Sequence, residues 1–397
     1  MFKRPMIIAV VALMGFGLLA IYSSTMYEAG TSYLVKQAIW VAIGLAAMVG
    51  VTFVRTRSLE AFGPVIYGVT MLMLALVLVV GSGPHGARRW FNLGFMRFQP
   101  SELAKIATIV MLARYLSGQK VIGDSIRSVL VVFAIVGAPA ILILYEPDMG
   151  TALVVAFIAF PMLYAAGLDP LYLAFLVSPF LAVISAGEIV AWIIFSGFLI
   201  TVMLLAKFRT SLVALIFGIN FVVGSLAPRI WMALEPYQRQ RIEAFLNPDA
   251  YQHGAGFQTI QSQIAVGSGG LIGKGLFKGT QKALGLVPEQ HTDFVFSVLG
   301  EELGLAGCLI VLGLLMYVIM KSFETAKTAR DRFTTYFCFG VASLILIQTL
   351  INVGMNLGML PVTGLTLPFV SYGGSSIIVL LGSMGVVLSA YAARKGY

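Results

Sequence analysis

The chain alternates between long apolar windows and short polar segments. Windows of about 20 apolar residues are typical of helices that cross a membrane. Twelve such windows are predicted, at residues 6–26, 34–54, 63–82, 101–116, 127–145, 150–167, 171–187, 189–206, 210–227, 294–320, 334–353 and 374–393. Very short turns separate the three windows between 171 and 227, where a kinked or re-entrant segment could be mistaken for a span.

Composition assigns these windows to an integral membrane protein. The 397 residues are 59% hydrophobic and 11% charged, with a mean hydropathy of +0.94, whereas soluble globular chains carry about 25% charged residues. We therefore predict an all-α polytopic membrane protein with about 10–12 transmembrane helices, forming a single integral membrane domain over residues 1–397. No convincing small-residue cleavage site follows the first window, so we expect it to stay as a span rather than act as a signal peptide.

Residue types narrow the chemistry. Cys308 and Cys338 lie in apolar windows, which argues against a disulfide framework and against a cysteine metal site. His85, His253 and His291 lie in polar segments without the spacing of a metal site. The net charge of +9 suits contact with anionic lipid head groups and is not by itself a sign of nucleic-acid binding. A membrane is thus an expected partner and nucleic acid is not.

The positive-inside rule gives a predicted orientation. Basic residues in the short loops fall on one side when both termini are cytoplasmic: Lys3, Arg4, Arg55, Arg57, Lys120, Arg127, Lys207, Arg209, Lys327, Arg330, Arg332, Arg394 and Lys395. Three polar or helix-broken segments then lie outside. They are a first extracytoplasmic loop at 82–100, a large extracytoplasmic loop at 228–292 and a segment at 354–373.

Basic residues in the external segments oppose this rule. The first external loop is short and contains Arg88, Arg89 and Arg97, whereas a long loop can be translocated whatever its charge. Guanidinium groups bind phosphate oxygens bidentately. The first loop therefore indicates a polyanionic ligand on the outer face.

The sequence after Arg97 predicts the start of a helix with a charged pair. Pro100 and Ser101 are helix-start residues. Glu102 and Lys105 are three residues apart and share a helix face, so an ion pair between them would make both charges tolerable in the membrane. Such a pair has to face protein or water rather than lipid, which makes a structural role and a role in a site compatible.

Two aspartates stand where a polar segment meets a predicted helix. Asp148 precedes Gly150 and Thr151 in a short external turn, and Asp293 precedes the window 294–320. Both can be helix N-caps, because Asp is a preferred capping residue. Ionisable groups at the edge of a membrane segment are also candidates for function, so both interpretations stay open.

Residues 267–275, Gly-Ser-Gly-Gly-Leu-Ile-Gly-Lys-Gly, resemble a phosphate-binding loop only superficially. Ser268 stands where that motif has its first glycine, and Gly275 follows Lys274 where Ser or Thr is required. The dinucleotide-binding spacing fails at Ile272. No nucleotide cofactor is expected, but a flexible loop that exposes its backbone near an anionic substrate stays possible.

The segment 360–376 is apolar, yet prolines and paired glycines interrupt it at Pro361, Pro368, Gly373 and Gly374. Irregular backbone in an apolar segment is typical of a re-entrant stretch that lines a cavity. A simple turn between two spans is the alternative.

These motifs together resemble the SEDS family (shape, elongation, division and sporulation), the polytopic peptidoglycan polymerases. The resemblance covers most of the chain and rests on six motifs in order: Arg-Phe-Gln-Pro-Ser-Glu at 97–102, Pro-Asp-Met-Gly-Thr at 147–151, Gly-Ser-Gly-Gly at 267–270, His-Thr-Asp-Phe at 291–294, Glu-Glu-Leu-Gly at 301–304 and Pro-Phe-Val-Ser-Tyr-Gly-Gly-Ser at 368–375. Residues 237–241 and 274–281 are more similar to the elongation members than to the division members. The family usually has ten spans, and the surplus predicted here lies between about 171 and 227.

The resemblance implies an inverting glycosyl transfer at the outer face of the bacterial cytoplasmic (inner) membrane. Lipid II is polymerised into glycan strands for cell elongation and shape, and undecaprenyl diphosphate is released. The essential aspartate of the family corresponds to Asp293, which we expect to act as the general base. The expected substrate-binding residues are Arg97, Gln99, Glu102, Lys105, Asp148, Arg239, Arg241 and Ser371.

Further expectations concern a cation, a partner and two acidic residues. We expect a divalent cation, Mg²⁺ or Mn²⁺, on the diphosphate, with Glu102 and Asp148 as candidate ligands, because Mg²⁺ is usually held by one or two carboxylates together with substrate phosphates. The family resemblance implies a class B penicillin-binding protein, a transpeptidase, as the partner. Glu301 and Glu302 are interpreted as structural residues that form salt bridges within the bundle.

Three alternatives stay open at this point. A lipid II flippase or transporter would use intramembrane charges and a cavity equally well. A division-type polymerase would share the chemistry, and a scaffold for wall-synthesis proteins would need none. Asp293 discriminates between a polymerase, which needs the carboxylate for turnover, and a scaffold, which should tolerate Asn there.

Overall fold

The computed structural model describes residues 4–26, 30–83, 87–92, 94, 97–119, 126–208, 210–251, 255–283 and 289–393. The elements are α1 (Arg4–Thr25), α2 (Ser32–Thr52), α3 (Thr56–Val80), β1 (Phe91–Asn92), β2 (Arg97–Phe98), α4 (Pro100–Ser117), α5 (Ile126–Tyr145), α6 (Met149–Ala165), α7 (Pro170–Ser185), α8 (Ile189–Leu205), α9 (Thr210–Ala233), α10 (Pro236–Leu246), the 3₁₀ turn η2 (Pro248–Tyr251), α11 (Ala255–Ser268), α12 (Thr280–Ala283), α13 (Val295–Lys327), α14 (Arg332–Asn356) and α15 (Gly374–Ala393). Seven residues named above lie outside the described ranges: Lys3, His85, Lys120, Arg209, His253, Arg394 and Lys395.

Each of the twelve predicted windows is helical in the structure. Eight of the described helices are long and apolar enough to cross a membrane: α1, α2, α3, α5, α9, α13, α14 and α15. The apolar helices α6, α7 and α8 are shorter, and α4 carries charged residues and is largely enclosed by protein. The prediction of an all-α, multi-pass membrane protein is confirmed.

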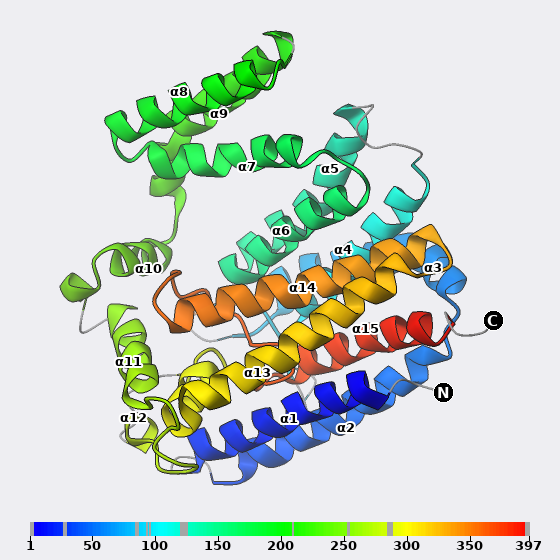
Figure 1. The fold of residues 1–397 in the computed structure, drawn as a ribbon, viewed down its shortest axis with the longest axis vertical. Coiled ribbons are helices and arrows are strands. Elements are labelled where there is room, and N and C mark those ends of the chain that lie inside the picture. Colours follow the sequence, from blue (N-terminus) through cyan, green and yellow to red (C-terminus); the bar gives the residue numbers. More distant parts are fainter. Residues whose placement is uncertain are drawn as a thin grey trace. The chain divides into compact units, whose positions relative to one another are not determined.

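The contacts between residues group the chain into two compact units. The larger unit comprises Met1–Ala166 and Ala244–Tyr397, and the smaller unit comprises Gly167–Glu243. Within the larger unit, α14 packs on α4, α6 and α13, while α2 lies along α15 and α1 lies along α13 (Figure 1). Within the smaller unit, α7, α8 and α9 pack around Phe175, Leu199 and Met203. The single domain expected from the sequence stays a prediction.

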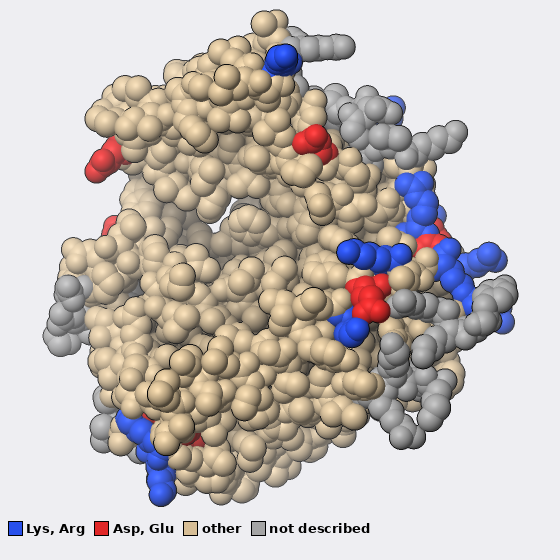
Figure 2. Space-filling model, viewed as in Figure 1, with Lys and Arg blue, Asp and Glu red and all other residues tan. Residues whose placement is uncertain are grey.

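Charged residues of the larger unit collect at the ends of its long helices. The face over α13, α14 and α15 in Figure 2 is almost entirely uncharged, and the Lys, Arg, Asp and Glu side chains visible there lie near opposite ends of these helices. An uncharged band between two charged ends is the pattern of a protein that crosses a bilayer.

The external segments contain more structure than loops. Residues 82–100 include the antiparallel pair β1–β2, in which Phe91 is opposite Phe98. The segment 228–292 is not one loop, because α9 continues through Pro228 to Ala233 and three further helices follow. Membrane helices tolerate proline where neighbouring groups satisfy the freed backbone, and Pro228 does not end α9.

The segment 357–373 is irregular and packed into the protein. Its apolar side chains Leu365, Leu367, Phe369 and Val370 are buried. A methyl group added at Gly17 of α1 would collide with the backbone of Val370, so α1 and this segment are in direct backbone contact. A helix-broken, buried apolar stretch is what the sequence predicted for a re-entrant segment.

Candidate active site

Asp293 lies in a turn at the start of α13. Its backbone N–H donates to the carbonyl oxygen of Glu289 (3.1 Å), and Glu289 itself has a positive φ of 51°. Phe294, not Asp293, is the N-cap residue of α13, and no side chain caps this helix. The N-cap assignment therefore does not support the capping interpretation of Asp293.

Two asparagines on α14 hold this turn through its main chain. The side-chain amides of Asn352 and Asn356 each donate to the carbonyl oxygen of Asp293 (3.0 Å). Asn352 also donates to the carbonyl oxygen of Leu365 (2.6 Å), and the Oδ1 of Asn356 accepts from the backbone N–H (3.1 Å) and hydroxyl (2.6 Å) of Ser297. Both asparagines are completely buried. They connect α14, α13 and the segment 357–373 at one point.

The sequence interpretation did not include Asn352 and Asn356. A usable signal was present, because two amides four residues apart share one helix face at the end of the window 334–353 and just beyond it. A polar side chain without a partner is expensive in an apolar environment. Such a pair therefore predicts a protein contact rather than a lipid contact.

The Asp293 side chain is half-buried beside the segment 357–373. A methyl group added at Gly364 would come within 3.4 Å of Oδ2 of Asp293. Gly364 has a φ of +73°, a left-handed conformation that glycine adopts without strain. The backbone of this segment thus approaches the carboxylate closely, while part of the side chain stays accessible.

Three aromatic rings pack together beside Asp293. The ring centroids of Tyr33 and His291 are 4.7 Å apart, and Tyr372 lies 5.2 Å from Tyr33 and 5.5 Å from His291. The backbone N–H of Tyr372 donates to the carbonyl oxygen of His291 (2.9 Å). Burial, with a contribution from Tyr33 and opposed by the positive charge of Arg97, raises the pKa of Tyr372.

The hydroxyl of Ser371 accepts a hydrogen bond from the backbone N–H of Leu367 (2.8 Å), and its carbonyl oxygen accepts one from the Gln37 side chain (3.4 Å). Gln37 also accepts from the backbone N–H of Gly373 (3.2 Å). Ser371 therefore stabilises the turn in this structure. Its expected role in substrate binding stays a prediction.

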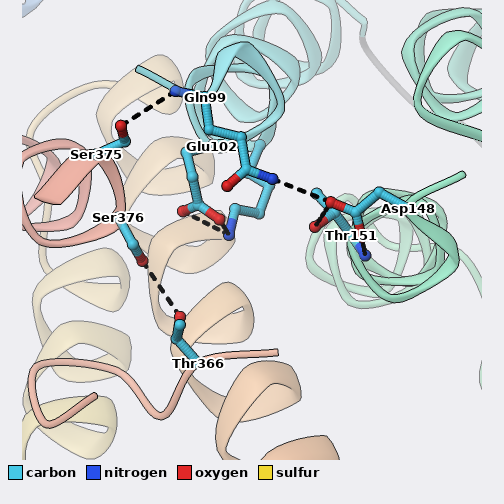
Figure 3. A network of polar contacts seen from close by, with 8 residues as sticks. Gln99, Glu102, Asp148, Thr151, Thr366, Ser375 and Ser376 are labelled. Atoms are coloured by element: carbon cyan, nitrogen blue, oxygen red, sulfur yellow. Dashed lines mark hydrogen bonds and ion pairs between the residues drawn. The ribbon is translucent and has the colours of Figure 1, made fainter. Parts of the chain in front are cut away.

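The predicted pair of Glu102 and Lys105 is present on α4. The Nζ of Lys105 lies 2.8 Å from the carboxylate of Glu102, and the two residues are 2% and 8% exposed, respectively (Figure 3). The cavity beside them has a volume of about 10 Å³ and is also lined by Gln348 of α14 and Ser376 of α15. This volume corresponds to roughly one water molecule, so no sugar fits there unless side chains move.

A second polar connection joins the start of α4 to the start of α6. Asp148 caps α6 by accepting from the backbone N–H (3.1 Å) and hydroxyl (2.9 Å) of Thr151. The side-chain amide of Gln99 donates to the same carboxylate (3.1 Å), as Figure 3 shows. Ser375 of α15 links to the same region, because it accepts from the backbone N–H of Gln99 (3.1 Å) and donates to the carbonyl oxygen of Arg97 (3.2 Å).

Residues 371–376 therefore connect the two groups of site residues. Tyr372 is hydrogen-bonded to His291 beside Asp293, while Ser375 and Ser376 reach the residues at the start of α4. The side chain of Arg97 is exposed on β2, and its charge acts on Tyr372. Among the described residues, no hydrogen bond or ion pair engages its guanidinium, so Arg97 can accept an anionic ligand.

The other arginines of the first external loop hold backbone carbonyls. Arg88 donates to the carbonyl oxygens of Leu78 and Val79 at the end of α3 (3.0 Å each). Arg89 donates to the carbonyl oxygens of Glu146 (2.8 Å) and Pro147. These contacts account for Arg88 and Arg89 on the outer side, where the positive-inside rule does not favour them, and no ligand is needed to explain them.

The carboxyl group of Glu146 is buried in the same turn. The residue is 0% exposed, and neither carboxyl oxygen has a hydrogen-bond partner among the described residues. Burial, together with the negative charge of Asp148 and opposed by the positive charge of Arg89, raises the pKa of Glu146 to about 9. Glu146 is consequently neutral at physiological pH.

Arg239 and Arg241 belong to the smaller unit. Arg239 donates to the carbonyl oxygens of Leu234 (3.0 Å) and Met232 (2.6 Å) at the end of α9. The guanidinium of Arg241 lies over the ring of Tyr237 at 5.8 Å. The larger unit thus brings together Asp293, Ser371 and the residues from Arg97 to Asp148, but not these two arginines.

The two candidate metal ligands are engaged in other contacts. The carboxylate of Glu102 pairs with Lys105, and that of Asp148 accepts from Thr151 and Gln99. No group of three His, Cys, Asp or Glu residues that could hold a metal ion occurs within the described part of the chain. Mg²⁺ prefers several oxygen ligands in octahedral geometry, so these residues do not form a ready-made site for a resident cation.

Comparison with known proteins identifies the family. Residues 4–196 and 171–396 match the cell cycle protein family of FtsW, RodA and SpoVE. The chain belongs to this family. The two matched stretches overlap at 171–196, in the region where the sequence predicts surplus spans. The resemblance to SEDS proteins stated above is thereby confirmed.

Relatives within the family are similar over nearly their whole length. The peptidoglycan glycosyltransferase MrdB of Escherichia coli K12 is 34% identical over 391 residues, covering 98% of this chain and 93% of that protein. A probable peptidoglycan glycosyltransferase FtsW of Geobacter metallireducens is also 34% identical, over 97% of this chain and 93% of the relative. Sequence identity alone thus does not separate the two types.

Solved structures share the fold. One is a chain from a structure of a peptidoglycan synthase complex, described in terms of its coordination of polymerization and crosslinking. It has a TM-score of 0.74 and 32% identity, covering 100% of this chain and 99% of that chain. The crystal structure of the rod shape determining protein RodA of Thermus thermophilus has a TM-score of 0.65 and 27% identity, covering 100% of this chain and 98% of that one.

Proposed function

We propose that this protein is a peptidoglycan glycosyltransferase of the elongation type, which joins lipid II to a growing glycan strand and releases undecaprenyl diphosphate. The similarity to MrdB over 98% of the chain supports the reaction class. The observation that carries the assignment of the site is Asp293, a half-buried carboxylate on a turn held by Asn352 and Asn356.

Asp293 suits the role of a general base. The 4-hydroxyl of an acceptor sugar is a weak nucleophile, and a positioned carboxylate that removes its proton contributes roughly 10²–10⁴ in rate. The asparagines bind the main chain of Asp293, so they fix the turn without changing the charge of its carboxylate. The attacking oxygen forms its bond to the anomeric carbon as the bond to the lipid diphosphate breaks.

Positive charge is needed where the diphosphate leaves. Arg97 is exposed and its charge reaches Tyr372, two residues before Gly374 at the start of α15, so we assign it this role. Lys105 could contribute only if its ion pair with Glu102 opened, because that pair is buried. Gln99, Asp148 and Ser371 then shape the site through the contacts described above.

An apolar groove offers a place for the lipid tail. A cavity of about 630 Å³ is lined by Val54, Ser58, Leu59, Phe62, Val65, Ile66, Val69, Thr70 and Leu103. Leu103 brings the first turns of α4 to this groove, which otherwise lies mostly along α3. Binding of a polyprenyl chain in such a groove is favourable, because its apolar surface is removed from water or bulk lipid and makes close van der Waals contacts with the lining side chains.

The reaction requires a defined membrane orientation. We place the protein in the bacterial cytoplasmic membrane with both termini in the cytoplasm and Asp293 on the outer side, following the distribution of Lys and Arg. A class B penicillin-binding protein is the proposed partner. The structure of a complex that coordinates polymerization and crosslinking supports this pairing.

A divalent cation would enter with the substrate. Because Glu102 and Asp148 are engaged by protein groups, we propose that Mg²⁺ or Mn²⁺ arrives bound to the diphosphate and is not held beforehand. Polymerisation should then depend on the cation, whereas the melting temperature of the substrate-free protein should not.

The test uses purified protein in liposomes with lipid II and Mg²⁺ or Mn²⁺, with and without the transpeptidase partner. Glycan products are resolved on a gel for the wild type and for Asp293→Asn of equal melting temperature. Glycan chains from the wild type alone support both the polymerase and its base. Chains from both proteins reject Asp293 as the base, and lipid II translocation without any chains would indicate a flippase instead.

A further inference from the structure

The helix α13 is interrupted at Gly304, which has φ 66° and ψ −165°. In a continuous α-helix the N–H groups of Leu305 and Ala306 would donate to the carbonyl oxygens of Glu301 and Glu302. They donate instead to the carbonyl oxygens of Gly270 (2.9 Å) and Leu271 (3.0 Å). The break thus leaves two helical acceptors to be satisfied elsewhere.

The same glycine-rich loop satisfies those two acceptors. The backbone N–H groups of Lys274 and Gly275 donate to the carbonyl oxygens of Glu301 and Glu302 (3.0 Å each). These two donors and two acceptors of α13 are therefore all paired with the loop 269–275. The loop is inserted into the helix and is not a free external segment.

Side chains lock this insertion. The buried carboxylate of Glu301 accepts from the Nζ of Lys274 (2.7 Å), from the backbone N–H of Thr280 (2.7 Å) and from that of Gln281 (3.0 Å). Methyl groups added at Gly269 or Gly273 would collide with the backbone of α13. The glycines are required for close packing of backbone on backbone, so the sequence-based option of a flexible, ligand-facing loop is wrong for this segment.

The position of the break along α13 indicates its depth in the membrane. No charged residue occurs between Leu303 and Met320, a stretch of about 27 Å at 1.5 Å per residue. Leu305 lies about 24 Å from Lys321 along the axis, which is less than the hydrocarbon thickness of about 30 Å. With Lys321 at one interface, the break falls inside the opposite edge of the hydrocarbon layer, and any helix tilt moves it deeper.

We propose that the tip of this loop, Leu271 and Ile272, is inserted among lipid acyl chains of the leaflet on the Asp293 side. These side chains are 72% and 84% exposed. The loop continues the lipid-facing surface of α13, because Leu271 is hydrogen-bonded to Ala306, next to the exposed Leu305. This inference does not depend on the proposed reaction.

The hydrogen bonding of the loop fits such an environment. Irregular backbone at membrane depth needs protein partners for its polar groups, and the carbonyl oxygens of Gly270 and Leu271 and the N–H groups of Gly273, Lys274 and Gly275 have them. Exposed Lys278 and Thr280 follow the tip and return the chain to the polar interface. The segment is therefore a re-entrant hairpin within the polar stretch 228–292.

Single-cysteine labelling tests the depth. Ile272→Cys carries an environment-sensitive fluorophore in liposomes, with Lys278→Cys as the aqueous control and Leu309→Cys, on the exposed face of α13, as the lipid control. The native Cys308 and Cys338 are buried, and the parent protein measures their background labelling. Iodide in water and spin-labelled lipids serve as the two quenchers.

The fluorescence of the label at Ile272 should be quenched in the same way as that of the label at Leu309. Spin-labelled lipid should quench it several-fold more strongly than the label at Lys278, and iodide should quench it less. Leu271→Cys gives the same reading if Ile272→Cys does not fold. Quenching by iodide as strong as at Lys278 would overturn the proposal in favour of an aqueous loop. Protection from both quenchers would also overturn it, because protein would then cover the tip.

Discussion

Glu146 provides the sharpest test of the electrostatics of the site. Its carboxyl group is completely buried in the turn between α5 and α6, and burial together with Asp148 raises its pKa to about 9. The neutral acid is therefore the native form. We expect Glu146→Gln, which is neutral at every pH and similar in size, to raise the free energy of unfolding at neutral pH.

The sign and size follow from the difference in pKa between the two states. The unfolded carboxyl group titrates near 4.5 and the folded one near 9, so wild-type stability is full below the lower value and falls as pH rises between the two. The slope is about 1.4 kcal/mol per pH unit, which gives roughly 3 kcal/mol at pH 7. Even a third of this value should raise the melting temperature by a degree or more.

The assay is thermal unfolding in detergent at pH values of about 5, 7 and 9. The intrinsic fluorescence of the four tryptophans is preferable to a thiol-reactive dye, because thiol reactivity itself changes with pH. The advantage of Glu146→Gln over the wild type should be smallest at the lowest pH and largest at the highest.

Asp148→Asn is the matched control in the same turn. Asp148 accepts three hydrogen bonds, from Thr151 and from Gln99. Its loss as an acceptor should lower the free energy of unfolding by about 1–2 kcal/mol, and this loss should be largest at the lowest pH, because at higher pH the variant also removes the negative charge that raises the pKa of Glu146. If Glu146→Gln melts below the wild type, or if their difference does not change with pH, Glu146 is ionised and paired in the native protein and the reasoning fails.

Three further predictions concern the main chain around Asp293 and α13. Asp293→Asn should lower glycan synthesis by about 10² or more with an unchanged melting temperature, and a matching loss of stability would contradict this. Asn356→Ala should lower the free energy of unfolding by about 2–4 kcal/mol, since the backbone N–H and hydroxyl of Ser297 and the carbonyl oxygen of Asp293 lose their partner. A change within 0.5 kcal/mol would refute the idea that Asn356 holds this turn. Gly273→Ala should destabilise the protein in a denaturant titration, because the new methyl group meets the backbone of α13. The control is Gly267→Ala, at a helical position with open space, which should be neutral or stabilising by about 0.5–1 kcal/mol. Equal effects of the two substitutions on stability would refute the close packing of the loop on α13.

Local patterns in the sequence were sufficient for the helices and for part of the site. Hydropathy predicted all eight described helices that are long and apolar enough to cross a membrane, because length and apolar content decide which segments can enter a bilayer. The other four predicted windows are also helical, but α6, α7 and α8 are shorter and α4 carries charged residues. The cap at Asp148 and the pair of Glu102 and Lys105 could also be predicted, since their partners lie three residues away along the chain. Contacts at this distance follow from the spacing of residues in the sequence.

Long-range main-chain contacts could not be predicted from the sequence in this way. The break at Gly304 depends on hydrogen bonds to residues 270–275, and nothing in the local sequence of α13 distinguishes this glycine from the other glycines of its apolar run. The roles of Arg88 and Arg89 were missed for the same reason. Their charge suggested a ligand, but the groups they bind are carbonyl oxygens, which every residue carries and no sequence pattern marks.

The division of α13 into two parts gives a physical reason for the placement of Asp293. Beyond the break, the part from Leu305 to Lys327 spans the membrane and exposes apolar side chains such as Leu309. Before the break, nearly all residues from Val295 to Glu302 are buried in protein. The turn that carries Asp293 is therefore held by protein contacts and not by lipid, and it is held through its main chain. The main chain of this turn has its own support from Asn352 and Asn356, so substitution of the Asp293 carboxylate is a direct test of its role in catalysis.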